Sequence, residues 1–502
     1  MAVKVLAHPS VADRRAQGAD ARIQTPPELH TGWEPAGDRP DPVSQLEEQN
    51  ATREPDLVPV RHGRMMVSPF TFYRGAAKIM ATDLAGTPTA GLTTQLCGDA
   101  HLSNFGVFAS PERDLLFDLN DFDETLPGPF EYDVQRMDAS FTIAARNNGL
   151  TNAEATSATL KSVRAYREAM AQFARMGVME LWYTHMAAAD IEAGLSKLAG
   201  DGKPAKAAKT GKKAKSSKGT KAAKGVERAR EDGAAEAARL AKKSMAKALT
   251  RDSLQALSKL GELVDGHYRI ISQPPIVVPL RDVNAEEYGM TLADIERALH
   301  EQFRDYRSTL QDDRRHLLEK FEIIDMARKV VGVGSVGTRA FILLLQGRDE
   351  QDPLFLQVKE ATSSVLEDHL PKSRYHNPGE RVVRGQRMMQ ATSDIYLGWT
   401  KGAQANRFLY WRQLRDMKGS ALIDSMGAFR LEYYAGMCGW TLARAHARAG
   451  DPVAIDAYLG RGDDFDRAIT DFSQHYADQN EKDYQAFVAA VGSGRIDAVE
   501  GV

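Results

Sequence analysis

The pattern of hydrophobic and polar positions divides the chain into five segments. Residues 1–60 hold eight of the 21 prolines and show little apolar periodicity, so we expect an extended or disordered segment. Residues 61–150 combine helical and strand patterns, and residues 151–325 are dominated by helical periodicity. Strand patterns with polar turns fill residues 326–420, and helices return over residues 421–502. The order of these patterns predicts an α+β protein.

Two short strand patterns in the second segment each lead into a polar cluster. GLTTQL at 91–96 precedes CGDAHLSN at 97–104, and LLFDL at 115–119 precedes NDFDE at 120–124. Sites are commonly built at strand ends, and carboxylate and amide oxygens suit a hard cation such as Mg²⁺. The alternative is a turn of solvated acids. The residues concerned are Asp99, Asn104, Asp118, Asp121 and Asp123.

An amphipathic helix is predicted just before the first cluster. SPFTFYRGAAKIMATDL at 68–84 starts with Ser-Pro and places apolar residues at helical spacing. Arg74 and Lys78 share its polar side. Arg74 has two open roles, since it could contact a phosphate or form an ion pair with the acidic clusters.

The fourth segment contains a glycine-rich turn between two strand patterns. Gly332, Gly334 and Gly337 match GxGxxG, which two folds share. A dinucleotide-binding fold requires a helix after the glycines, but here the strand pattern AFILLL follows. A glycine hairpin over nucleotide phosphates is therefore favoured, and it predicts a lysine on the following strand. Lys359 in FLQVKEA is that lysine.

A site of this kind also needs an acid that holds the lysine in place. Glu380 is the candidate, at the start of a helix pattern in which the spacing of Val382, Val383, Gln386 and Met389 suits one buried face. Glu367 is its competitor. Glu380 could also be an acid at a helix N-terminus that the helix dipole stabilises.

Composition narrows the class of protein. The chain has 502 residues, of which 43% are hydrophobic, so two or three structural units are expected. Two cysteines are too few for a disulfide framework, which favours a reducing compartment. No apolar run approaches the roughly 18 residues of a membrane span. We therefore expect a cytoplasmic protein without a membrane partner.

The net charge is −3, although the insertion at 199–226 is rich in lysine. Its Lys, Ala, Gly and Ser content cannot form a core, so we expect it to be disordered. A weak contact with a polyanion is one interpretation of the clustered lysines. A solvated surface loop is the other, because no aromatic residue is interleaved to stack on bases.

The polar clusters resemble known motifs. CGDAHLSN is similar to the HGDxHxxN loop of aminoglycoside phosphotransferases and related small-molecule kinases, matching at Gly98, Asp99, His101 and Asn104, with Cys97 where a histidine is usual. FDLNDFDE resembles their strand-borne metal aspartate, and EYDVQRMDAS resembles a later helix of the same proteins. The stretch from 61 to about 492 also resembles a bacterial family of uncharacterised proteins with the motifs SPFxFxRG, GDAHxxNFG, NDFDETLPGP, VGVGSVGTR, QVKEA and RQLRDMKGS.

The kinase resemblance implies a two-lobed protein kinase-like fold that binds ATP and Mg²⁺. Asp99 would be the catalytic base, and Asn104 and Asp118 would bind the metal, with Asp121 or Asp123 as a rival or second ligand. Ordinary kinases place the glycine loop and lysine before these motifs, whereas here they come last. The resemblance therefore implies a circular permutation, which domains with neighbouring termini tolerate.

The expected function is phosphoryl transfer from ATP to a hydroxyl of an unknown acceptor, with a small molecule preferred on resemblance alone. Three alternatives stay open. The protein could be a catalytically silent nucleotide-binding regulator, an AMP transferase with the same cleft, or a metal-dependent hydrolase built on His101 and the aspartates.

Overall fold

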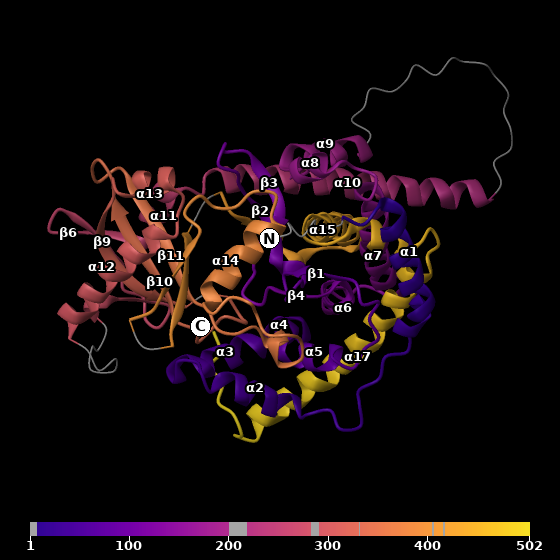
Figure 1. Cartoon of the computed structure of the whole chain (residues 1–502), viewed down its shortest axis with the longest axis horizontal. Coiled ribbons are helices and arrows are strands. Elements are labelled where there is room, and N and C mark those ends of the chain that lie inside the picture. Colours follow the sequence, from indigo (N-terminus) through magenta and orange to yellow (C-terminus); the bar gives the residue numbers. More distant parts are fainter. Residues whose placement is uncertain are drawn as a thin grey trace, which may run out of the picture.

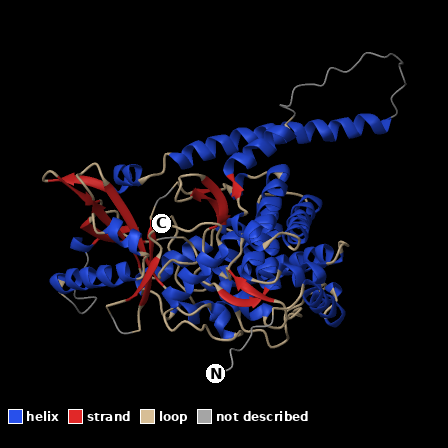
Figure 2. Cartoon of the chain, turned by 45° about the horizontal axis from the view of Figure 1, so that its top comes forward, coloured by secondary structure: helices blue, strands red, loops and turns tan. Residues whose placement is uncertain are grey.

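The computed structural model describes residues 8–199, 218–282, 291–330, 332–403, 406–414 and 417–501. Helices and antiparallel sheets make up a mixed α+β chain, which confirms that class (Figure 2). The largest sheet and the helices on its two faces form what we call the sheet region. The helices around α6, α7, α15 and α17 form the helical region, on the other side of the molecule (Figure 1).

The helical region is built on four long helices. They are α6 (Phe130–Asn147), α7 (Asn152–Phe173), α15 (Ala428–Ala449) and α17 (Asp464–Gly492). Gly439 permits the close packing of α15 on α7, because a Cβ there would lie 2.2 Å from the carbonyl oxygen of Ser162. The inner face of α15 includes its buried residues Tyr434, Cys438, Thr441, Leu442 and Ala445. Both cysteines of the chain are free and buried.

The sheet region contains six antiparallel strands in the order β12-β13-β11-β10-β9-β8. Their bounds are β8 Val277–Pro279, β9 Glu322–Lys329, β10 Ala340–Gln346, β11 Pro353–Glu360, β12 Gly398–Lys401 and β13 Phe408–Gln413. The predicted succession of strand, glycine turn, strand, polar turn and strand is therefore present as β9, β10 and β11. Helix α14 (Pro378–Met389) buries Val382, Val383, Gln386 and Met389, as its periodicity predicts.

Period-two alternation gives this sheet two different faces. Leu343 and Leu345 of β10 pack with α12 (Leu292–Ser308) and α13 (Asp312–Leu318), whereas Ile342 and Leu344 pack with α11 (Ser253–Leu260). The sheet region therefore begins near residue 253, and not at 326 as the sequence patterns predict. Helical periodicity shows that a face is buried, but it does not identify the sheet that buries it.

The described residues also form three smaller sheets. β1 (Thr93–Leu96) pairs with β4 (Leu126–Pro129), and β6 (Gly261–Val264) pairs with β7 (His267–Ile270). The third has the order β14-β2-β3-β5, with bounds β2 Phe105–Ala109, β3 Leu115–Leu119, β5 Met186–Ala187 and β14 Gly419–Ser420.

The N-terminal segment differs from the prediction of an extended chain over residues 1–60. From residue 8 onward it contains α1 (Val11–Gln24), α2 (Pro42–Asn50) and α3 (Val58–Met65), with short 3₁₀ turns at Pro27–His30 and Pro55–Leu57. Several prolines stand in the first turn of these elements, where the missing N–H costs nothing. Val43 and Leu46 are buried in one cluster with Phe487 of α17.

The predicted helix at 68–84 forms as two helices, α4 (Pro69–Gly75) and α5 (Ala77–Leu84), separated at Ala76. The remaining helices are α8 (Val178–Tyr183), α9 (Ala188–Leu198), α10 (Lys218–Leu249) and α16 (Pro452–Leu459), and further 3₁₀ turns lie at Leu102–Asn104, Leu280–Asp282, Val365–Asp368 and Ile423–Ser425.

The lysine-rich insertion at 199–226 falls largely outside the described residues, which omit 200–217. Residues 218–226 form the start of α10, where the sequence predicts disorder. Within the described ranges, every helix is too short or too polar to cross a membrane.

Candidate functional site

Strand register brings the two polar clusters side by side. Leu96 at the end of β1 is opposite Leu126 of β4, and Phe105 at the start of β2 is opposite Leu119 of β3. The loops at 97–104 and 120–125 therefore both cross from the two-stranded to the four-stranded sheet. A hydrogen bond from the Asn120 N–H to the Asn104 carbonyl joins them at 2.8 Å.

These two loops line a cleft of about 450 Å³. The sheet region adds the glycine turn to the same cleft, and the N-terminal helices add α2 and α4. The structure thus gathers six of the predicted positions on the wall of one cleft, namely Asp99, Asn104, Asp121, Asp123, Gly332 and Gly334.

Lys359 of the sheet region is 3% exposed and contacts two residues of the cleft wall, Asp123 and Ser335. Lys359 and Val358 are neighbours on β11, so their side chains point to opposite faces of the sheet. Val358 packs with α12 on one face. The Lys359 Nζ lies 2.5 Å from Oδ2 of Asp123, and 3.3 Å from the hydroxyl oxygen of Ser335 in the glycine turn. Tyr410, the cross-strand neighbour of Lys359, donates to Oδ1 of Asp123 at 2.6 Å. A strand lysine and a loop carboxylate from distant parts of the chain therefore meet.

Burial and mutual attraction compete within this pair. Burial alone would lower the pKa of Lys359, but the Asp123 carboxylate outweighs it and raises that pKa above its ordinary value. Burial likewise opposes ionisation of Asp123, and Lys359 with Tyr410 nevertheless lowers its pKa. Both groups are therefore charged at neutral pH. Burial raises the pKa of the neighbouring Glu124 to about 7, against the charge of Arg381 and the Val365 N–H, which donates to Glu124 at 2.7 Å.

Asp99 is held at the rim of the cleft by Arg136 of α6. The guanidinium Nε donates to Oδ1 of Asp99 at 2.8 Å, and Arg136 also lies 3.8 Å above the ring of Tyr73. Burial raises the pKa of Asp99 above its ordinary value, against the effect of Arg136. His101 is buried, with 3.8 Å between its Nε2 and Oδ2 of Asp99, and burial lowers its pKa. Asn104 donates to the backbone carbonyl of Asp99 at 2.6 Å.

The carboxylate of Asp133 fixes the backbone of the Asp99 loop. It accepts hydrogen bonds from the N–H groups of Cys97 and Gly98 at 2.7 and 2.9 Å, and it lies 3.1 Å from Nε2 of His446 on α15. Gly98 has a φ of +83°, which favours glycine. Sequence reasoning assigned no role to Asp133 or Arg136, although the EYDVQRMDAS motif contains both.

Asp118 is not brought to the cleft. Its side chain is 1% exposed and forms a buried ion pair with Arg444 of α15. It also accepts hydrogen bonds from the backbone N–H groups of Leu119 and Ala391, at 2.9 and 2.8 Å. Because Asp121 and Asp123 line the cleft and Asp118 does not, the two later aspartates fit the part of metal ligand better than Asp118.

The glycine turn is attached to the N-terminal helices. Arg53 donates to the carbonyl of Val336 at 2.5 Å, the Glu54 N–H donates to the carbonyl of Gly337 at 2.8 Å, and Arg64 donates to the carbonyl of Gly332 at 2.5 Å. Gly332 and Gly337 have φ values of +68° and +86°, so both positions favour glycine. Gly337 itself contacts Arg53 and not the cleft.

Glu380 does not approach Lys359. It lies in the first turn of α14 and pairs with Arg384 at 3.3 Å. Its competitor Glu367 accepts from the backbone N–H groups of Ser364 and Ser373, at 3.1 and 3.2 Å. In this structure the partner of Lys359 is instead Asp123, in the loop after β3.

Among the described residues, no group of three or more His, Cys, Asp or Glu side chains is placed to hold a metal ion. Mg²⁺ typically takes one or two carboxylates and completes its shell with water and substrate phosphates. Asp121 and Asp123, with the Asn104 amide nearby, fit an ion of that kind arriving with a nucleotide.

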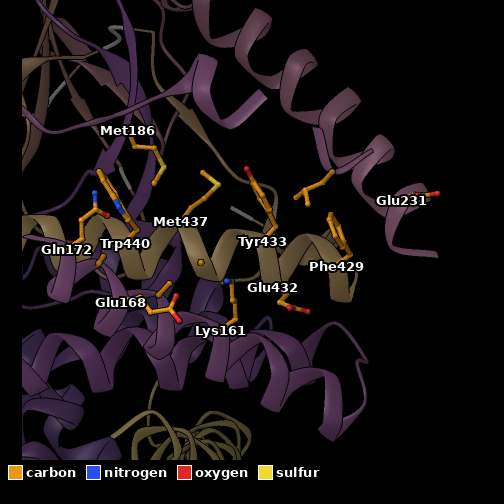
Figure 3. A pocket seen from close by; sticks show the side chains of 14 residues that line it. Lys161, Glu168, Gln172, Met186, Glu231, Phe429, Glu432, Tyr433, Met437 and Trp440 are labelled. Atoms are coloured by element: carbon orange, nitrogen blue, oxygen red, sulfur yellow. The ribbon is translucent and has the colours of Figure 1, made fainter. Parts of the chain in front are cut away.

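A larger hollow of about 780 Å³ lies elsewhere, lined by residues of α7 and α15 together with Met186 of β5, Leu198 of α9 and Glu231 of α10 (Figure 3). Its wall presents Trp440, Tyr433 and Met437 of α15 together with Lys161 and Glu168 of α7 (Figure 3). It contains none of the predicted residues. The smaller cleft is therefore the candidate site.

Comparison with known proteins identifies a family. The model of a family described as "uncharacterized protein conserved in bacteria" (DUF2252) matches the chain over residues 53–234 and 203–490. Among the curated proteins and the solved structures, none matches the chain. The two matched segments cover most of the sequence and confirm the expected family of uncharacterised bacterial proteins. The chain therefore belongs to the DUF2252 family of uncharacterized proteins conserved in bacteria.

Proposed function

We propose that the protein is an ATP- and Mg²⁺-dependent phosphotransferase that acts on a hydroxyl group of a small molecule, with a kinase-like arrangement of two lobes in permuted order. The observation that carries the proposal is the contact between Lys359 and Asp123, which lie 236 residues apart in the chain. Kinase-like chemistry requires a strand lysine, a metal aspartate and a glycine turn at one set of phosphates. The cleft wall includes the aspartate and the glycine turn, and Lys359 contacts that wall at Asp123 and Ser335, which supports the proposal.

Each group then has a role in the proposed reaction. Asp99 accepts the proton of the acceptor hydroxyl, whose oxygen attacks the terminal phosphorus of ATP. The bond from that phosphorus to the bridging oxygen breaks, and ADP leaves. Lys359 binds the phosphates, and Asp121 and Asp123 would hold the metal with Asn104. Mg²⁺, when bound, neutralises phosphate charge.

Replacing Asp121 with asparagine is expected to remove the Mg²⁺-dependent part of ATP binding. Losing a hydrogen-bond partner of a metal ligand already costs roughly 10–100-fold in metal affinity, so losing a ligand should cost at least as much. The measurement is the melting temperature with ATP, with and without Mg²⁺. Asp114→Asn, an exposed acid in the hairpin before β3, is the matched control. A full Mg²⁺-dependent shift in Asp121→Asn would contradict the metal assignment.

Asp99→Asn is expected to retain Mg²⁺-ATP binding and to lose turnover, by roughly 10²–10⁴-fold, because the amide cannot accept the proton. Turnover is followed with ATP labelled at the terminal phosphate, using water, the protein itself and a panel of hydroxyl compounds as acceptors. Label at the α-phosphate distinguishes AMP transfer. Unchanged turnover in Asp99→Asn would show that another group is the base.

A nucleotide-binding regulator without catalysis is the second candidate. It is favoured by the hydrogen bond from Arg136 to Asp99, because a carboxylate held by a guanidinium is a weaker base. The same assays separate the two functions. A regulator binds Mg²⁺-ATP with the same dependence on Asp121 but shows no turnover with any acceptor, and Asp99→Asn then changes nothing.

A further inference from the structure

Two arginines of the N-terminal helices line the candidate cleft. Arg53 follows α2, and Arg74 stands in the last turn of α4. Both meet the glycine turn. The carbonyl oxygen of Arg74 lies 3.1 Å from the position that a Cβ on Gly334 would take, and Cβ of Arg53 lies 3.0 Å from the corresponding position on Gly337.

Within the described residues, each of these two guanidinium groups has one buried N–H donor without a hydrogen-bond partner. In the part of the chain that the structure describes, Nε of Arg53 and Nε of Arg74 are buried and have no hydrogen-bond partner. Lys78, in the same cleft, differs because it pairs with Glu48 at 3.1 Å and Asp368 at 3.2 Å. A buried donor without an acceptor costs free energy, and a buried charge costs more.

The electrostatic surroundings place Arg74 beside the loop of the candidate base. Burial lowers the pKa of Arg74, and the charge of Asp99 opposes that effect. The positive charge of Arg74 in turn adds to burial in lowering the pKa of His101. Burial also lowers the pKa of Arg53, to about 10. Arg74 therefore lies between the Asp99 loop and the glycine turn, where a transferred phosphoryl group would carry negative charge.

We propose that Arg53 and Arg74 form a subsite for a phosphate-class oxyanion. The inference rests on the proposed function, since it assigns a further part of the same cleft. Guanidinium groups match the oxygens of a phosphate with paired, charge-assisted hydrogen bonds. The oxyanion has two possible sources with one chemistry, the terminal phosphate of the nucleotide and a phosphate group on the acceptor.

Calorimetric titration of the full chain with inorganic phosphate tests the subsite. Arg74→Gln and Arg53→Gln are each expected to weaken phosphate binding by roughly tenfold or more. Lys78→Gln, whose charge is already paired, should stay within roughly twofold of the wild type. If Arg74→Gln does not fold, Arg74→Lys is tested in its place. A single ammonium then replaces the branched guanidinium, and we expect the same loss of phosphate affinity. Equal phosphate binding by the wild type and the arginine variants, or none by the wild type, would overturn the proposal.

The apo melting temperature separates ligand binding from a structural role. Burial opposes the charge of Arg74 more than Asp99 favours it, so removing that charge in Arg74→Gln should leave the melting temperature unchanged or higher. A large decrease, together with unchanged phosphate binding, would instead make Arg74 a structural partner of the acidic loops and overturn the subsite.

Competition identifies the source of the oxyanion. Phosphate is titrated into wild-type protein saturated with Mg²⁺-ADP or with Mg²⁺-ATP. Binding only to the ADP complex assigns the subsite to the terminal phosphate of the nucleotide, and binding to both complexes assigns it to the acceptor. If the wild type does not bind Mg²⁺-ATP but still binds phosphate through Arg74, the subsite is supported and the proposed function is contradicted.

Discussion

Lys359→Met is expected to lower ATP turnover by roughly 10²–10³-fold, the usual loss when one preorganised electrostatic group is removed from a transition state. It is also expected to destabilise the apo protein by about 3 kcal/mol or more, because Asp123 would keep a buried charge without its cation. Tyr410 would still donate to Asp123 and offset part of that cost. The two measurements are turnover of labelled ATP and unfolding in urea.

A double variant separates the two effects of this substitution. Lys359→Met with Asp123→Asn removes both charges and should recover most of the lost stability, while turnover stays low. Lys401→Met, an exposed lysine at the end of β12 in the same sheet, is the matched control and should change neither quantity. If Lys359→Met keeps wild-type turnover, the lysine is only a structural partner of Asp123 and the phosphotransferase proposal fails.

Arg444→Met is expected to destabilise the protein by about 3–5 kcal/mol, the usual cost of removing one partner of a buried ion pair. Arg444 and Asp118 are each 1% exposed, so water cannot replace the missing partner. The free energy of unfolding in urea measures the loss. Arg448→Met is the control one turn later on α15, where the guanidinium lies 3.9 Å from the ring of Trp182. A loss of about 1 kcal/mol is expected there.

The double variant Asp118→Leu with Arg444→Met tests the role of Asp118 itself. Replacing a buried ion pair by apolar groups is often neutral, so stability should return toward that of the wild type. The Mg²⁺-dependent ATP shift should also persist, because Asp118 lies outside the cleft. If this shift disappears in a folded double variant, Asp118 belongs among the metal ligands after all.

Local sequence patterns were sufficient to predict the elements that bury one face and expose the other. The buried face of α14 follows from its periodicity. The glycine turn between β9 and β10 follows from two strand patterns around three glycines, and Lys359 lies on the next strand. The N-terminal segment was predicted wrongly, because its prolines begin helices there and its apolar residues are buried by distant segments. Val43 and Leu46 pack with Phe487 of α17, and Leu57 and Val60 pack with Val330 and Val336.

The aspartates near β3 show why sequence could not choose among them. All residues from Leu116 to Leu119 are buried, so period-two alternation does not separate the two faces of this strand. Asp118 faces Arg444 of α15, and Asp123 faces Lys359 of β11. These partners lie more than 200 positions away in the chain, and no local pattern around an aspartate indicates which cation it will meet.

The sequence by itself determined the α+β class, the principal strands, the buried face of α14 and the residue types of the candidate site, because these depend on the spacing of neighbouring side chains. Only the tertiary structure decided that Asp123 pairs with Lys359, that Asp118 is buried on Arg444, and that Arg53 and Arg74 line the cleft. Those contacts depend on strand register and helix packing between distant segments. They are set by burial of the whole chain and not by any stretch of it.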